Sequence, residues 1–226
     1  METDTACDDP LTYLHRKPLR NFVREQLIYE TPDHLYVSIQ GRVKVTRHIG
    51  TGSEVVTVMV PAEGLFGESC LIGRGHAECA AALDNVTVMA WTREEIEQQI
   101  EREPRLGVAL LRYLQSRSLR LQARVASLAV YATGERVGLS LVELAKELGN
   151  PIPDGSMRVS SLTHQTVAQY AGTSREIVTS QMNRLRRMGL IRYSRKHIDV
   201  YVLALEDELR HNGVTVPETQ TLTRAG

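Results

Sequence analysis

The sequence predicts an α+β fold with an N-terminal β-roll, one long helix, and a C-terminal part made of short helices and a β-hairpin. Up to about residue 92, Val-rich segments alternate partly between apolar and polar residues, as half-buried antiparallel strands do. From residue 104 onward, the apolar residues recur at the spacing of a helix instead. A chain of 226 residues is long enough for two modest domains with cores of their own.

The strand pattern is clearest in four segments of the N-terminal part. They are residues 34–40, 42–46, 54–60 and 85–91, and the glycines and prolines between them favour turns. Many short strands at this spacing are typical of a small β-barrel or β-roll. We therefore expect residues 1–103 to form one β-roll domain.

Two helices are expected next. Thr92 with Glu95 matches a capping box at the start of a short helix, and Pro104 suits the first turn of a second one. This second helix is predicted over residues 104–133, about 45 Å at 1.5 Å per residue, which is too long for one small domain to cover. Its apolar residues repeat as heptads, so we expect two copies to pair as a homodimer, the alternative being a helix packed on its own domain. The expected seam consists of Leu111, Leu114, Ser118, Leu121, Val125 and Leu128.

The remaining chain is predicted to form one domain and a tail. Gly134 is expected to end the long helix, with a further helix over residues 135–149. The domain is expected to span residues 134–212. Residues 213–226 are polar and rich in Thr, which predicts a disordered tail.

Charge is distributed unevenly along a chain whose formal net charge is zero. Residues 1–103 carry 10 basic and 17 acidic side chains, whereas residues 156–200 carry 8 basic and 2 acidic ones, a net charge of +6. Such a basic segment attracts nucleic acid through counterion release, whatever the base sequence.

The basic segment contains the pattern of a helix-turn-helix. Ala168 is the small residue required where the two helices cross, and Gly172 suits the turn between them because glycine tolerates positive φ. Val178 is placed on the buried face of the second helix. Thr173 and Glu176 are expected to form the capping box that starts this helix.

The first turn of the second helix would face the major groove of double-stranded DNA. There an arginine can donate two hydrogen bonds to guanine, and a glutamate can accept one from cytosine. The candidate base-reading residues are Arg175, Glu176, Thr179 and Ser180. The pattern of residues 189–202 predicts a β-hairpin, or wing. The candidate phosphate contacts are Thr163, His164, Gln165, Ser174, Arg195 and Lys196.

With these motifs, residues 30–203 resemble the catabolite activator protein and fumarate-nitrate regulator superfamily. The matching segments are residues 64–68, 127–129, 134–136 and, most specifically, 174–178. The resemblance implies a β-roll like the cyclic-nucleotide-binding jelly roll, a dimerisation helix and a winged helix-turn-helix. It also implies a transcription regulator with the role of an activator, which binds palindromic promoter DNA and contacts RNA polymerase.

The sequence departs from the members that bind cyclic AMP. Glu68 matches the glutamate of their phosphate-binding turn, but the arginine and serine that hold the phosphate correspond to Glu78 and Cys79. A carboxylate would repel a cyclic phosphate. The adenine-contacting pair corresponds to Leu121 and Gln122. We therefore expect no binding of cyclic AMP in the usual mode, although the same pocket is expected at Phe66, Gly67, Glu68 and Arg117.

Single residues bear on other effectors. The approach to the winged helix is similar to the nitrogen-control branch, whose effector is 2-oxoglutarate. Arg117 falls where that branch carries a ligand-binding arginine, but Gln122 replaces an acidic partner. The leading interpretation is a regulator without a small-molecule effector.

The three cysteines, Cys7, Cys70 and Cys79, are too few for an iron–sulfur cluster and fit a reducing cytoplasm. Haem ligation by Cys70 with His76, and a reactive thiol at Cys70 or Cys79, are the alternative interpretations.

Other classes of protein have less support. The seven histidines are scattered, with no metal-ligand spacing, Gly-rich phosphate loop or nucleophile elbow, so we expect no metal, no cofactor and no enzyme. No apolar run approaches a membrane span, and no leader is visible, which predicts a cytoplasmic protein. The alternative is a β-roll interaction module whose winged helix contacts protein.

Overall fold

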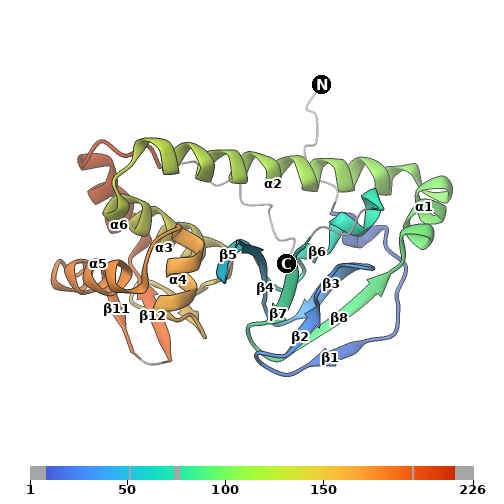
Figure 1. The fold of residues 1–226 in the computed structure, drawn as a ribbon, viewed down its shortest axis with the longest axis horizontal. Coiled ribbons are helices and arrows are strands. Elements are labelled where there is room, and N and C mark those ends of the chain that lie inside the picture. Colours follow the sequence, from blue (N-terminus) through green and yellow to red (C-terminus); the bar gives the residue numbers. More distant parts are fainter. Residues whose placement is uncertain (1–8, 51, 74–76, 195, 217–226) are drawn as a thin grey trace.

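The computed structural model describes residues 9–50, 52–73, 77–194 and 196–216. Its N-terminal part is the predicted β-roll, built from two four-stranded antiparallel sheets with strand orders β1-β8-β3-β6 and β2-β7-β4-β5 (Figure 1). The strands are β1 (Arg20–Phe22), β2 (Leu27–Tyr29), β3 (Leu35–Gln40), β4 (Val43–Ile49), β5 (Ser53–Val60), β6 (Leu65–Phe66), β7 (Cys79–Ala82) and β8 (Val86–Trp91), with 3-10 turns η1 (Pro10–Thr12) and η2 (Glu68–Ile72).

Alternating side chains of the strands fill the roll. One buried cluster includes Val43, Val45 and Val88, which point inward from β4 and β8. The aromatic rings of Tyr29, Tyr36 and Phe66 stack within it, with centroids 5.2 to 6.1 Å apart. This packing follows from the period-2 alternation of a strand that has one face buried.

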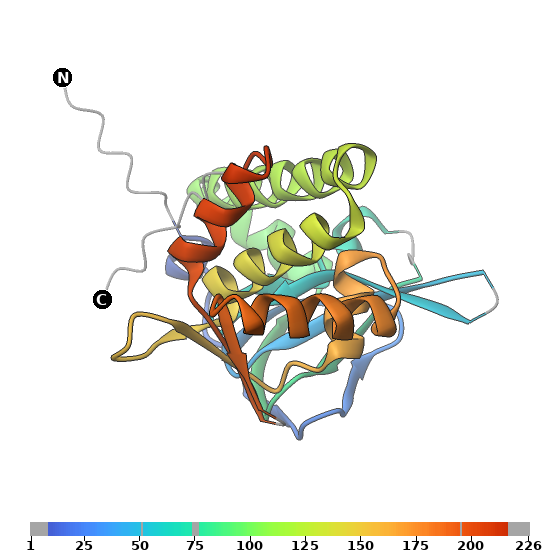
Figure 2. The ribbon, with the colours of Figure 1, turned by 90° about the vertical axis from the view of Figure 1, so that its left-hand side faces the viewer.

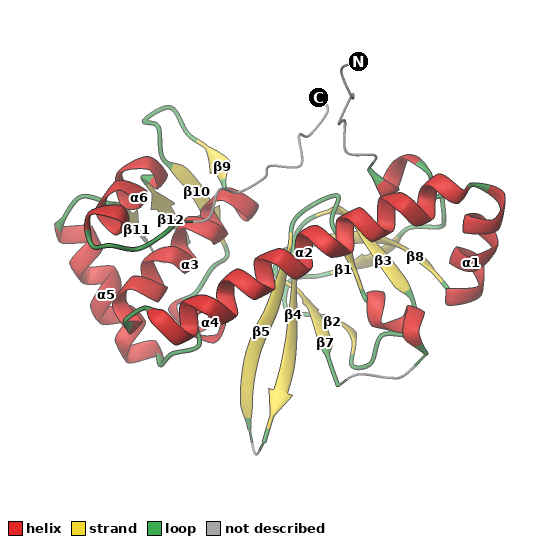
Figure 3. Ribbon diagram, turned by 90° about the horizontal axis from the view of Figure 1, so that it is seen from above, coloured by secondary structure: helices red, strands yellow, loops and turns green. Residues whose placement is uncertain are grey.

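Helix α1 (Arg93–Arg102) and helix α2 (Pro104–Val130) connect the roll to the rest of the chain. The predicted capping box is confirmed, since the Thr92 hydroxyl accepts from the Glu95 amide and Glu95 accepts from the Thr92 amide. The predicted start of the long helix at Pro104 is also confirmed. Figure 3 shows α2 running from the β-roll across to the C-terminal part.

The predicted end of this helix at Gly134 is wrong. The helix ends at Val130, and α3 (Thr133–Leu148) begins before the glycine, since Glu135 accepts a hydrogen bond from the backbone of an extended Ala132. Gly134 instead permits a close approach, because a Cβ atom there would lie 3.0 Å from the Gln181 side chain.

The C-terminal part is a winged helix-turn-helix, viewed from its own end in Figure 2. Its helices pack together on a sheet of order β11-β12-β10-β9. Its elements are α3, β9 (Asn150–Pro151), β10 (Met157–Ser160), α4 (His164–Ala171), α5 (Arg175–Arg187), β11 (Ile191–Tyr193), β12 (His197–Val200) and α6 (Val202–His211).

The prediction of a disordered tail from residue 213 is wrong for its first residues. Val214 is buried in the core of the winged helix, and the Thr215 amide donates to the Tyr131 hydroxyl at 2.9 Å. Residues 217–226 lie outside the described part of the chain. No helix in the described part is long and apolar enough to cross a membrane.

Candidate nucleic-acid interface

Helices α4 and α5 form the predicted helix-turn-helix. Ala168 and Val178 are buried where the helices meet, and Gly172 adopts the left-handed conformation with φ +64. The Thr173 amide closes the turn by donating to the Ala168 carbonyl at 3.0 Å. These contacts fix the angle at which α5 leaves the core.

The cap of α5 differs from the prediction by one residue. Ser174, and not Thr173, is the N-cap, and its hydroxyl accepts from the Ile177 amide at 3.4 Å. The expected capping box of Thr173 with Glu176 is therefore wrong, because the Thr173 amide already closes the turn. Hydrogen bonds from the first-turn backbone and Ser174 lower the pKa of Glu176, so this side chain is ionised at neutral pH.

The candidate base-reading residues are not equally free. Arg175, Glu176 and Ser180 are exposed on the first turns of α5. Thr179 is half-buried, and its hydroxyl donates to the Arg175 carbonyl at 2.8 Å while lying 3.0 Å from His164 Nδ1. The Thr179 hydroxyl is thus engaged within the protein, which leaves the other three side chains available to a ligand.

His164 joins three elements. Besides Thr179 of α5, its ring meets the Tyr193 ring of β11 edge to face, with centroids 5.3 Å apart. The Tyr193 hydroxyl in turn donates to Asn183 Oδ1 at 2.8 Å. Burial, and then the nearby Arg175 charge, lower the pKa of His164. The neutral ring is therefore favoured, and it braces α4, α5 and the wing.

The other expected phosphate contacts surround the same surface. The Thr163 hydroxyl caps α4 by accepting from the Thr166 amide at 3.0 Å, and Thr163, Gln165 and Lys196 are exposed. Arg195 lies outside the described residues. The last turn of α5 adds three exposed arginines that were not predicted as contacts, namely Arg184, Arg186 and Arg187.

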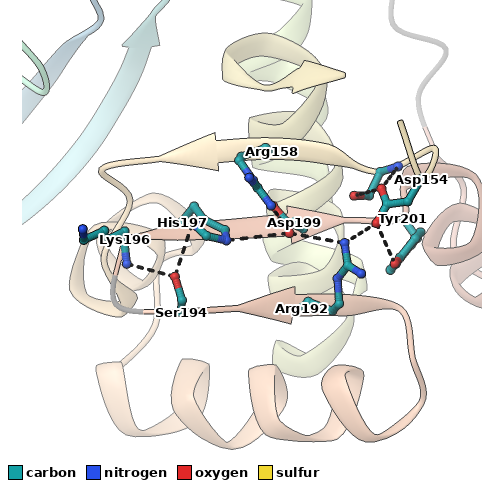
Figure 4. A network of polar contacts seen from close by, with 9 residues as sticks. Asp154, Arg158, Arg192, Ser194, Lys196, His197, Asp199 and Tyr201 are labelled. Carbon is teal, nitrogen blue, oxygen red and sulfur yellow. Dashed lines mark hydrogen bonds and ion pairs between the residues drawn. The ribbon is translucent and has the colours of Figure 1, made fainter. Parts of the chain in front are cut away.

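The wing contains a charge network that the sequence did not reveal (Figure 4). Asp199 is 2% exposed and accepts hydrogen bonds from Arg158 Nε at 2.7 Å and Nη2 at 2.8 Å. Arg192 lies 3.5 Å from Asp199 and also contacts Asp154. These bonds hold β10, β11 and β12 together on the face opposite the core, and they lower the pKa of Asp199.

The expected dimer seam on α2 is largely uncovered in the single chain. Leu111 is 68% exposed, Val125 67%, Leu128 53% and Leu121 39%, whereas Leu114 and Ser118 are half-buried. The face of α2 that packs on the β-roll is a different one, marked by Leu106 and Leu110. A continuous apolar stripe of this kind is typical of a surface that another protein covers.

The residues of the expected effector pocket make contacts with one another and with their neighbours in the β-roll. Arg117 of α2 lies 2.8 Å from Glu68, and the buried Glu78 accepts a hydrogen bond from the Tyr29 hydroxyl at 2.8 Å. Phe66 belongs to the aromatic stack. Gly67 has φ +78, and a Cβ atom there would lie 2.5 Å from the His34 carbonyl.

The two cysteines in the described part are poor nucleophiles. Burial, followed by the Glu68 charge, raises the pKa of Cys70 to about 11. Burial also raises the pKa of Cys79. Because the thiolate is the reactive form, neither sulfur is activated at neutral pH. Cys7 and His76 lie outside the described residues.

Comparison with known proteins agrees with this architecture. Residues 20–103 match the model of the cyclic nucleotide-binding domain, and residues 135–211 match that of the Crp-like helix-turn-helix domain. A CRP-like cAMP-activated global transcriptional regulator of Mycobacterium tuberculosis is 31% identical over 75% of this chain and 76% of its own length. The chain belongs to the CRP/FNR family. It is thus a DNA-binding transcription regulator of that family.

Other similar proteins cover more of the chain at lower identity. The global nitrogen regulator of Synechocystis is 26% identical over 89% of this chain and 96% of its own length. A solved CRP-family transcriptional regulator from Thermus thermophilus superposes with a TM-score of 0.72 at 24% identity, covering 88% of this chain and 98% of that one. The shared fold therefore extends over both the β-roll and the winged helix.

Proposed function

We propose that this CRP/FNR-family regulator binds palindromic promoter DNA as a homodimer, and that cyclic AMP does not control it in the family's usual mode. The observation that carries the proposal is the exposed first turn of α5, where Arg175, Glu176 and Ser180 face solvent at the start of a well-anchored helix. In this proposal, residues 1–103 are the β-roll, α2 pairs the two chains, and the winged helix reads DNA.

Each side chain on α5 has a distinct role in this proposal. Arg175 donates to guanine O6 and N7, and Glu176 accepts from cytosine N4. Ser180 adds a weaker contact, and Thr179 acts mainly by holding the Arg175 carbonyl. Phosphate groups are held around them by Thr163, His164, Gln165, Ser174, Arg195 and Lys196, with help from helix N-termini.

The pairing of two chains rests on the stripe along α2. Its exposed leucines and valine would be buried against the same stripe of a second copy, as expected for a two-fold symmetric interface. Two recognition helices would then enter successive major grooves about 34 Å apart. RNA polymerase is the further partner that the family implies, with the role of an activator.

The absence of control by cyclic AMP rests on charge and space in the roll. Glu78, a buried carboxylate, takes the place of the phosphate-binding arginine. Arg117 is paired with Glu68 in this arrangement. The Glu78 carboxylate would repel a cyclic phosphate there, and this repulsion is costly away from water. We propose that the protein needs no small-molecule effector.

Binding selection followed by gel shifts at several salt concentrations tests the DNA part of the proposal. We expect a two-fold symmetric site, bound with steep salt dependence. Binding without sequence preference, or no binding, would support the alternative in which the winged helix contacts protein. Calorimetric titration with cyclic AMP, and in parallel with 2-oxoglutarate, tests the effector part, and saturable binding that changes DNA affinity would contradict it.

A further inference from the structure

We infer that Arg124 of α2 is a positioning residue that fixes the winged helix on the β-roll of its own chain and thereby sets the spacing between the two recognition helices of the dimer. The inference rests on the proposed homodimer. It concerns how far apart the two reading surfaces are held, and not which bases they read.

The guanidinium of Arg124 joins three separate elements. Nη1 donates to the Thr57 carbonyl at 2.9 Å, and Nη2 donates to the carbonyls of Val56 at 3.1 Å and Tyr170 at 2.6 Å. Its central carbon also lies 3.9 Å from the centroid of the Tyr170 ring. One side chain of α2 thus holds β5 of the roll and α4 of the winged helix. This arrangement suits a planar group with several fixed N–H donors.

Apolar packing surrounds these hydrogen bonds. Val56 and Met59 of β5 are buried in the same cluster as the core of the winged helix. Gln169 of α4 donates to Glu54 of β5 at 2.6 Å. The Tyr170 hydroxyl donates to Glu143 of α3 at 3.2 Å. Hence the contact is a packed interface with Arg124 near its centre.

A second arginine fastens the other end of this interface. Arg42, just before β4, is held by Asp84 through bonds of 2.6 and 2.9 Å. It also donates to the carbonyls of Ser160 at 2.9 Å and Leu148 at 3.4 Å in the winged helix. Two separated attachment points restrict rotation of the winged helix more than either one alone.

The interface leaves the DNA-reading surface free. It uses Gln169 and Tyr170 at the C-terminal end of α4, whereas Arg175 and Glu176 remain exposed on α5. The docked arrangement is therefore compatible with DNA binding. Arg124 is also next in sequence to Val125 of the seam, so the residue that fastens the winged helix lies on the helix expected to pair. A rigid path then connects one reading surface to the other.

The test uses the full chain and a selected palindromic site. Affinity is measured for this site and for the same half-sites with one base pair added to or removed from the spacer, at fixed salt. We expect Arg124→Gln to bind the selected site about tenfold more weakly, which is about 1.4 kcal/mol. We also expect it to lose much of the discrimination between spacers while keeping the same base preference in each half-site. Arg105→Gln, an equal charge change at an exposed position of α2, is the control. Its affinity for the selected site and its discrimination between spacers should equal those of the parent protein.

Two further measurements keep the inference falsifiable. Arg124→Lys retains the positive charge but not the planar guanidinium. Its affinity for the selected site and its discrimination between spacers should lie between those of the parent and of Arg124→Gln. The lysine variant replaces the glutamine variant if circular dichroism shows that the latter does not fold. An unchanged spacer discrimination in a folded variant would overturn the inference. If the parent protein itself selects no two-fold site, the proposed function fails instead.

Discussion

Replacing Val125 with alanine should weaken pairing of the chains without unfolding them. Val125 lies in the C-terminal part of the α2 stripe and is 67% exposed in the single chain, so it adds little to the core of its own protomer. In a symmetric dimer the same side chain would be buried twice, once from each chain. The substitution removes two methyl groups per chain from that interface.

The size of the effect follows from these exposures. Two buried methyl groups contribute about 1.6 kcal/mol, and because about two thirds of the side chain remains to be covered, the loss is about 1 kcal/mol per chain. The dimer therefore loses about 2 kcal/mol, a roughly 30-fold increase in the dissociation constant. Val125→Asp should be more severe, since it would place two carboxylates in an apolar seam.

Sedimentation equilibrium over a range of concentrations measures this shift. Leu203→Ala, at a leucine that is 77% exposed on α6, provides the control because α6 is not part of the expected seam. Equal dissociation constants for the Val125→Ala and parent proteins would refute the reasoning. A shift of the same size in Leu203→Ala would show that α2 does not hold the dimer.

Three other perturbations test the winged helix and the roll. Arg175→Ala should cost about 1–3 kcal/mol of DNA affinity and relax one base position, and unchanged selection at every position would remove Arg175 from the reading role. Asp199→Asn should lower the free energy of unfolding by about 2 kcal/mol, because two charge-assisted bonds from the partly exposed Arg158 are weakened. The pKa of Asp199 is lowered in the folded state, so its contribution to stability is complete above about pH 4 and is lost as the pH falls through the folded pKa. The free energies of unfolding of variant and parent, measured with urea, should therefore become equal in acid. Gly67→Ala should destabilise the roll, because φ is +78 and the new Cβ atom would lie 2.5 Å from the His34 carbonyl; an unchanged melting temperature would contradict this.

The sequence predicted features whose causes lie within a few residues of each other. The capping box at Thr92, the start of α2 at Pro104 and the turn at Gly172 depend on local hydrogen bonds and backbone preferences, and all three were found. The cap of α5 was misplaced by one residue because Thr173 and Ser174 are both good caps. Only the hydrogen bond that closes the preceding turn selects between them.

Contacts between distant segments could not be found in this way. Arg158, Arg192 and Asp199 meet because β10, β11 and β12 pair in a register that places them opposite one another. Arg124 donates to backbone carbonyls of residues 46 to 68 positions away. Because every residue has a backbone carbonyl, the residue types in the sequence do not indicate such an acceptor. In the sequence, these arginines and Asp199 do not differ from ordinary solvent-exposed charged residues. Their partners are determined only by the tertiary arrangement.

β5 belongs to the β-roll but also packs against the winged helix, and this limits where the chain can be cut into separate domains. A fragment cut at residue 134, where the domain was expected to begin, would lack Val56 and Met59, which complete the apolar core around α3 and α4. Its newly uncovered surface would favour aggregation. A separate winged-helix fragment should therefore stay in solution better if polar residues replace the apolar ones on that surface. The alternative is to link the β4–β5 hairpin to the fragment.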